Sequence, residues 1–176
     1  MREIVKDPYI LDFLASDPVR ERDLSKALTD NLARFLRELG TGFAFVGAEV
    51  PLRCGNREFF LDLLFYHCRL HRYVVFELKL DRFEPEYAGT LNFYVQLIDD
   101  HLRDQTRDDP TLGVLLVVGR DDVTVEVALR GISTPLAVTE WRRLPANVRH
   151  ALPSAEDLTE TVTRTVREIE STTPVA

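Results

Sequence analysis

Two stretches decide the fold of this chain: FFLDLLFY at residues 59–66 and YVVFELKL at residues 73–80. Each is a run of Phe, Tyr, Val and Leu of strand length, and the polar residues 67–72 separate the two runs. This composition predicts two antiparallel strands joined by a turn.

Three charged side chains lie inside these apolar runs. With the turn centred between Arg69 and Leu70, Asp62 falls directly opposite Glu77, and Lys79 is the diagonal neighbour of Asp62. Opposed residues on an antiparallel pair have Cβ atoms about 4.5 to 5.5 Å apart and share a face, so two carboxylates and an ammonium converge there.

Like charges placed opposite each other in an apolar setting are destabilising unless something compensates them. A divalent cation such as Mg²⁺ or Mn²⁺ between Asp62 and Glu77 would do so, since both ions prefer hard oxygen ligands. Lys79 could then orient a water molecule, and the arrangement predicts phosphodiester hydrolysis. In the alternative reading, Lys79 pairs with one of the two acids on a solvated face of the sheet.

Outward from this hairpin, the periodicity of apolar residues predicts an α/β domain with a mixed central sheet flanked by helices on both sides. Its order is αβββαβαβ plus a C-terminal helix. The further strands are expected at 43–52, 112–118 and 136–139, and the helices at 23–40, 85 to about 103, 121–130 and from 154 onward.

At 176 residues the chain has the length of one domain. We expect an N-terminal arm over 1–22 that packs on the domain, the domain itself over 23–153, and a C-terminal helix and tail over 154–176. The closing helix is expected to pack on its own domain, with a homodimer contact as the alternative.

The net charge of −7 argues against a protein that coats nucleic acid through its overall field, although it leaves room for a local basic face. The sequence contains no apolar run long enough to cross a membrane and no secretory signal, so we expect a cytoplasmic protein. Cys54 and Cys68 are accordingly expected to be free thiols.

The amino-acid sequence of five stretches resembles the C-terminal nuclease domain of the YhcG-type family, within the PD-(D/E)XK superfamily. The resemblance covers roughly residues 6 to 141, and a lone D…ExK pattern would be far less specific. In chain order the stretches are KDPYILDFL (6–14), GFAFVG (42–47), FFLDLLFYH (59–67), ELK (77–79) and PEYAG (85–89).

This resemblance implies a restriction-endonuclease-like fold and a metal-dependent endonuclease that cleaves DNA. It implies a site made of Asp62, Glu77 and Lys79, with the carbonyl of Leu78 as a further metal ligand. YhcG-type proteins usually carry another half before this domain, so a separate DNA-recognition or partner domain absent from this chain is also expected.

The sequence departs from the family pattern at several positions. Leu61 replaces the nominal proline, which is ordinary for this family. Ser25 and Thr90 stand where relatives often carry glutamate and glutamine, and they favour a second hypothesis, a catalytically silent nuclease fold that binds nucleic acid or protein. Glu49 also stands where relatives often show glutamine, and it could supply a replacement carboxylate.

Other residues are weaker candidates for the site. Tyr94, seven positions after Tyr87 on the same helical face, is either a core aromatic or a site residue. The turn after the second strand either binds phosphates or is simply solvated. Four residues at or near it are the candidates for phosphate binding: Arg53, Arg57, Arg69 and Arg72. The spacing of His67, Cys68 and His71 is poor for zinc.

Overall fold

The computed structural model of the chain describes residues 42–119 and 122–138, together with Lys26, Asp30, Arg34, Arg164 and Arg167. The elements in the two continuous ranges are β1 (Phe43–Cys54), β2 (Arg57–His67), β3 (Arg72–Arg82), α3 (Pro85–His101), β4 (Leu112–Gly119), α4 (Asp122–Leu129) and β5 (Leu136–Val138). This order confirms the predicted βββαβαβ portion of the fold. The expected arm at 1–22, opening helix and closing helix lie outside the described residues, apart from the five isolated positions.

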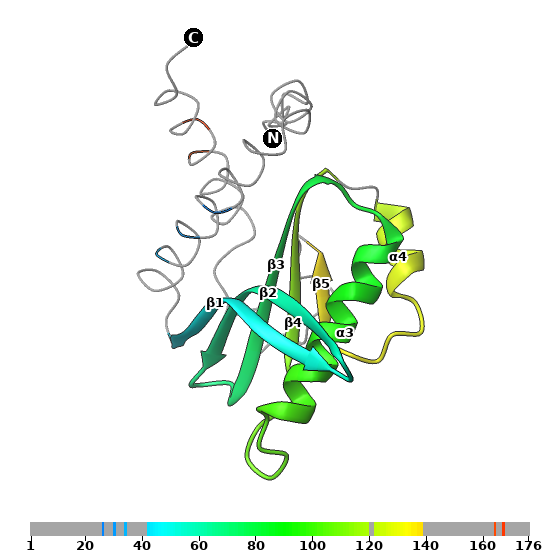
Figure 1. Cartoon of the computed structure of the whole chain (residues 1–176). Coiled ribbons are helices and arrows are strands. Elements are labelled where there is room, and N and C mark those ends of the chain that lie inside the picture. Colours follow the sequence, from blue (N-terminus) through cyan, green and yellow to red (C-terminus); the bar gives the residue numbers. More distant parts are fainter. Residues whose placement is uncertain are drawn as a thin grey trace.

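One five-stranded sheet organises the described part of the chain, with the strands in the order β1-β2-β3-β4-β5. The first three strands form an antiparallel meander, and β3 with β4 and β4 with β5 pair in parallel. The two parallel connections pass through α3 and α4, which lie on the same face of the sheet in Figure 1. The mixed sheet is therefore confirmed.

Buried side chains form one cluster on each face of this sheet. On the face covered by α3 and α4, Leu91 and Val95 of α3 pack with Val75 and Leu115 of the sheet. The cluster on the opposite face contains Leu63, Phe65, Val74, Phe76, Leu112, Val114, Leu116 and Ala137. Strand β4 supplies both clusters alternately, as expected for a strand that is buried on both faces.

Helix α3 begins where its sequence provides a start signal, with Pro85 in the first turn and Glu86 near the positive end of the helix dipole. It ends at His101 and is capped by Leu102, whose N–H still donates to the carbonyl of Ile98. None of the described helices has the length and apolar character needed to cross a membrane.

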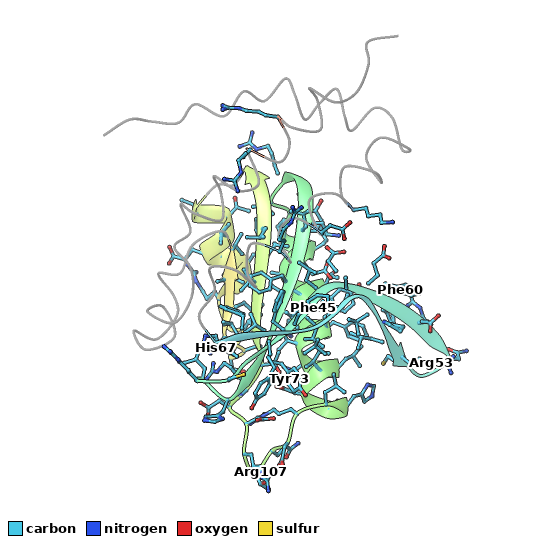
Figure 2. The ribbon with its side chains drawn as sticks, turned by 90° about the vertical axis from the view of Figure 1, so that its left-hand side faces the viewer. Phe45, Arg53, Phe60, His67, Tyr73 and Arg107 are labelled. Carbon is cyan, nitrogen blue, oxygen red and sulfur yellow. The ribbon has the colours of Figure 1, made fainter. Side chains whose placement is uncertain are left out.

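The β1–β2 hairpin extends past β3 as an arm. Strand β2 pairs with β3 only from His67↔Arg72 to Leu63↔Phe76, which confirms the predicted centre of the turn. Beyond that point, among the described strands, β2 pairs only with β1, as far as Cys54↔Arg57. We call residues 50–61 the hairpin arm, and Figure 2 shows it projecting from the sheet with Arg53 at its tip.

The hairpin arm is bent toward α3. Glu49, at its base, has a φ of 48°, and the β1–β2 register is irregular between Phe45 and Gly47. Within the arm, Phe59 packs against Phe93 of α3 with ring centroids 4.9 Å apart. Strands β2 and β3 consequently separate at Asp62 and Glu77, the positions that follow the Leu63↔Phe76 pair.

Candidate active site

Asp62 and Glu77 occupy the fork where β2 leaves β3. The Asp62 N–H donates to Glu77 Oε1 at 3.2 Å, and the Leu78 N–H donates to Asp62 Oδ2 at 2.8 Å. Each carboxylate thus accepts a backbone N–H of the other strand, in the place of a ladder carbonyl. The structure brings together the two acids that the sequence placed opposite each other.

Glu77 is the more buried of the two acids. Glu77 is 4% exposed, whereas Asp62 is half-buried. Burial, and next the negative charge of Asp62, raise the pKa of Glu77 to about 8, while the ammonium of Lys79 opposes this rise. Within the described protein, the pair therefore holds a proton near neutral pH unless a cation replaces it.

Lys79 lies two residues beyond Glu77 on β3, and strand alternation turns both toward α3, as it does Val75. Its Nζ lies 5.5 Å from the ring centroid of Tyr87, in the first turn of α3. A cation over an aromatic face is attracted by the ring quadrupole, so Tyr87 helps to fix the ammonium beside the carboxylates.

Tyr94 borders the carboxylate pair from the middle of α3. It is buried, and burial raises its pKa above the usual value, as do the charges of Glu77 and Asp62. Both tyrosines of α3 thus face the site. Sequence periodicity placed them on one helical face but gave no sign that Tyr87 would lie beneath Lys79.

The donors at this fork fit a divalent cation of the Mg²⁺ or Mn²⁺ class, since two carboxylates meet where burial raises the pKa of one of them. Across the described ranges, no third His, Cys, Asp or Glu joins them. Glu49 in particular is exposed and does not enter the group. A ligand role for the Leu78 carbonyl stays a prediction.

The four arginines considered for phosphate binding do not form one cluster. Arg53 and Arg57 flank the β1–β2 turn, while Arg69 and Arg72 belong to the β2–β3 turn at the other end of β2. Arg72 is buried and binds Asp109 at 3.3 Å. Figure 2 shows Arg53 far from His67, which marks the other turn.

The β2–β3 turn is held by a buried side chain. His67 is buried, and its Nδ1 accepts the N–H of Leu70 at 3.2 Å. Cys68 is exposed, as is Cys54 at the end of β1, and both are free thiols. These contacts give His67 a structural role in closing the turn.

The Thr90 hydroxyl forms a hydrogen bond within α3 itself. Thr90 is exposed, and its Oγ1 donates to the carbonyl of Glu86 at 3.1 Å. The position at which relatives often carry glutamine therefore contributes no polar group to the carboxylate pair. Ser25, the other departure, lies outside the described residues.

Comparison with known proteins assigns the chain to a family. A family model described as the YhcG PDDEXK nuclease domain matches residues 2–154. The chain belongs to this family. A curated YhcG-family relative from Escherichia coli (strain K12), named "Putative nuclease YhcG", is 33% identical over 154 residues, which make up 85% of this chain and 40% of the relative. The chain thus spans well under half the length of that relative. The family match confirms the restriction-endonuclease-like fold that the sequence predicted for this chain.

Solved structures give more distant likenesses to this YhcG-family domain. A repair endonuclease from Pyrococcus abyssi is 18% identical with a TM-score of 0.46, and the match covers 62% of this chain and 44% of the other. A protein of unknown function, AF1548, is 13% identical with a TM-score of 0.45, and the match covers 85% of this chain and all of the other.

Proposed function

We propose that this chain is a divalent-metal-dependent endonuclease that hydrolyses phosphodiester bonds, with DNA as its substrate. The observation that carries the proposal is the reciprocal contact of Asp62 and Glu77, each bound to a backbone amide of the other's strand. In a chain of the PDDEXK nuclease family, such a pair of acids is better explained by a metal site than by a structural role.

Asp62 and Glu77, with the carbonyl of Leu78, would hold Mg²⁺ or Mn²⁺. When bound, such an ion supplies positive charge against the phosphate and against the charge that develops on its oxygens. The chain's own contribution is a pair of oxygen donors that the diverging strands hold at a fixed spacing, with one donor kept out of water.

Lys79 is the third member of the proposed site. Its half-buried ammonium, directed by the ring of Tyr87, would hold the attacking water and donate a hydrogen bond to the phosphoryl oxygens. Tyr94 would border the reacting phosphate from α3. Both tyrosines limit the access of bulk water on that side of the site.

The tip of the hairpin arm would grip the substrate backbone. Arg53 and Arg57 stand there, and the Arg53 side chain is 82% exposed. Guanidinium groups bind phosphate oxygens well, and these contacts are independent of sequence. A local basic tip of this kind reconciles nucleic-acid binding with the net charge of −7.

Cleavage of a supercoiled plasmid, a single-stranded oligonucleotide and a branched duplex, each with and without Mn²⁺, tests the proposal. We expect metal-dependent cutting of at least one of these, lost by a factor of about 100 or more in Asp62→Asn and in Lys79→Ala. Asp100→Asn, which neutralises an exposed carboxylate on α3, is the matched control and should cut normally.

The proposal fails if the wild-type chain cuts none of these substrates with Mn²⁺ or Mg²⁺, or if Asp62→Asn cuts as well as Asp100→Asn. Binding without cutting would instead support the second candidate, a silent nuclease fold that serves as a binding module. The engagement of Thr90 within its own helix is the observation that favours this candidate.

A further inference from the structure

Phe60 is an aromatic side chain on the outer side of the hairpin arm. It is 57% exposed and lies directly across the ladder from Pro51, which is also exposed. Its neighbours along β2, Phe59 and Leu61, belong to the cluster beneath α3. Folding therefore leaves this ring largely in water while it buries the apolar residues on either side.

The position of Phe60 relative to the carboxylate pair makes its exposure informative. It precedes Asp62 by two residues of strand, which is about 6 to 7 Å along β2. In Figure 2 it lies on the arm between the body of the sheet and Arg53 at the tip. Phe60 is therefore close to Asp62 along the strand.

Charged groups on the same arm suit a nucleic-acid ligand. The guanidinium of Arg57 is exposed and lies 4.9 Å from the ring centroid of Phe59, on the side of the arm opposite Phe60. Arg53 pairs with Glu58 at 3.8 Å, and both side chains are exposed, so the pair is weak and a phosphate can compete for the guanidinium. An exposed aromatic near exposed arginines is a combination that binds single-stranded nucleic acid through stacking and charge.

We infer that Phe60, with Pro51, is a stacking platform for an unpaired base next to the cleaved phosphate, and that single-stranded DNA is the substrate class. The inference rests on the proposed nuclease function and deepens it. Bases in a duplex are already stacked inside the helix, and presenting one to Phe60 would cost the energy of unstacking and unpairing it. A single strand offers the face of its base at no such cost.

Binding without cleavage tests this inference. The fluorescence anisotropy of a labelled single-stranded oligonucleotide, and of the same sequence as a duplex, is measured in EDTA for the wild type, Phe60→Ala, Phe60→Tyr and the control Val127→Ala. Val127 is an exposed apolar residue of α4, so its substitution matches the loss of exposed apolar area. A 2-aminopurine in the single strand reports stacking through quenching of its fluorescence.

We expect Phe60→Ala to weaken single-strand binding by about 5- to 100-fold and to abolish the quenching, while Phe60→Tyr keeps both. Duplex binding should change by less than about twofold, and Val127→Ala should resemble the wild type. Equal losses for single strand and duplex, or a Phe60→Ala variant that binds like Val127→Ala, would overturn the inference and leave the nuclease proposal standing. A wild type that binds no nucleic acid would overturn both.

Discussion

At the scale of single residues, Glu77 illustrates the cost of building this site. A carboxyl group that is 4% exposed has lost its hydration, and a second carboxylate lies against it. The resulting pKa of about 8 is above the ordinary value of 4.5, so the folded protein keeps a proton that the unfolded chain releases. The contribution of Glu77 to stability is consequently complete below about pH 4.5 and is lost as the pH rises toward 8.

Glu77→Gln should therefore stabilise the metal-free protein at high pH. An amide stays neutral while it can still accept the Asp62 N–H, so the variant avoids the cost of ionisation. Relative to wild type, its free energy of unfolding should rise by roughly 2 to 4 kcal/mol between pH 5 and pH 9. Urea denaturation in EDTA at both pH values measures this, and parallel pH profiles for the two proteins would contradict it.

Binding of a divalent cation should depend on pH for the same reason. A cation at Asp62 and Glu77 must displace the proton of Glu77, so the apparent affinity for Mn²⁺ should fall by up to about tenfold for each pH unit below 8. Calorimetric titrations at pH 6 and pH 8 in two buffers would show the weaker binding and the released proton. Equal affinities at the two pH values, or unchanged binding by Glu77→Ala, would count against the metal site.

At the scale of elements, Gly113 permits the close approach of α3 to β4. A Cβ built at this position would lie 2.6 Å from Leu136 Cδ2 and 3.0 Å from both Leu91 Cγ and Val95 Cγ2. Gly113→Ala should thus push α3 away from the sheet and cost about 1 to 3 kcal/mol in urea denaturation. In the control Gly89→Ala, where a Cβ would meet no atom of the described residues outside its own helix, the helix should gain about 0.5 to 1 kcal/mol.

The hairpin arm should govern how nucleic-acid binding responds to salt. If Arg53 and Arg57 each contact one phosphate, then replacing either with alanine should lower the slope of log affinity against log salt by about 1. Arg130→Ala, at an exposed arginine just after α4, is the control, because Arg72 is buried and its replacement would disturb the fold. Slopes that are identical in all three alanine variants would remove the arm from the binding surface.

At the scale of the whole molecule, the sequence predicted much of the architecture because its apolar patterns are unambiguous. The runs at 59–66 and 73–80 fixed the hairpin and its register, and thereby the meeting of Asp62 with Glu77. Parallel pairing of β4 followed from the helix that precedes it. Each of these features depends on local periodicity, which a single sequence displays.

Features that depend on bending were not predicted. The departure of β2 from β3 arises from the bent arm, and the positive φ of Glu49 at its base has no local sequence signal such as glycine. Arg53 and Arg69 are far apart because the 11-residue strand β2 lies between their two turns, one turn at each of its ends. The ring of Tyr87 beneath Lys79 depends on how α3 crosses the sheet.

The reciprocal hydrogen bonds between backbone amides and carboxylates at the fork also give the molecule a built-in spectroscopic reporter. The amide protons of Asp62 and Leu78 are held by the very oxygens that protons and cations compete for. Any event that occupies those oxygens must alter the nuclear magnetic resonance shifts of two backbone amides, on different strands, at once. The state of the site can thus be followed from the peptide backbone, in a protein that has not been altered or labelled at any side chain.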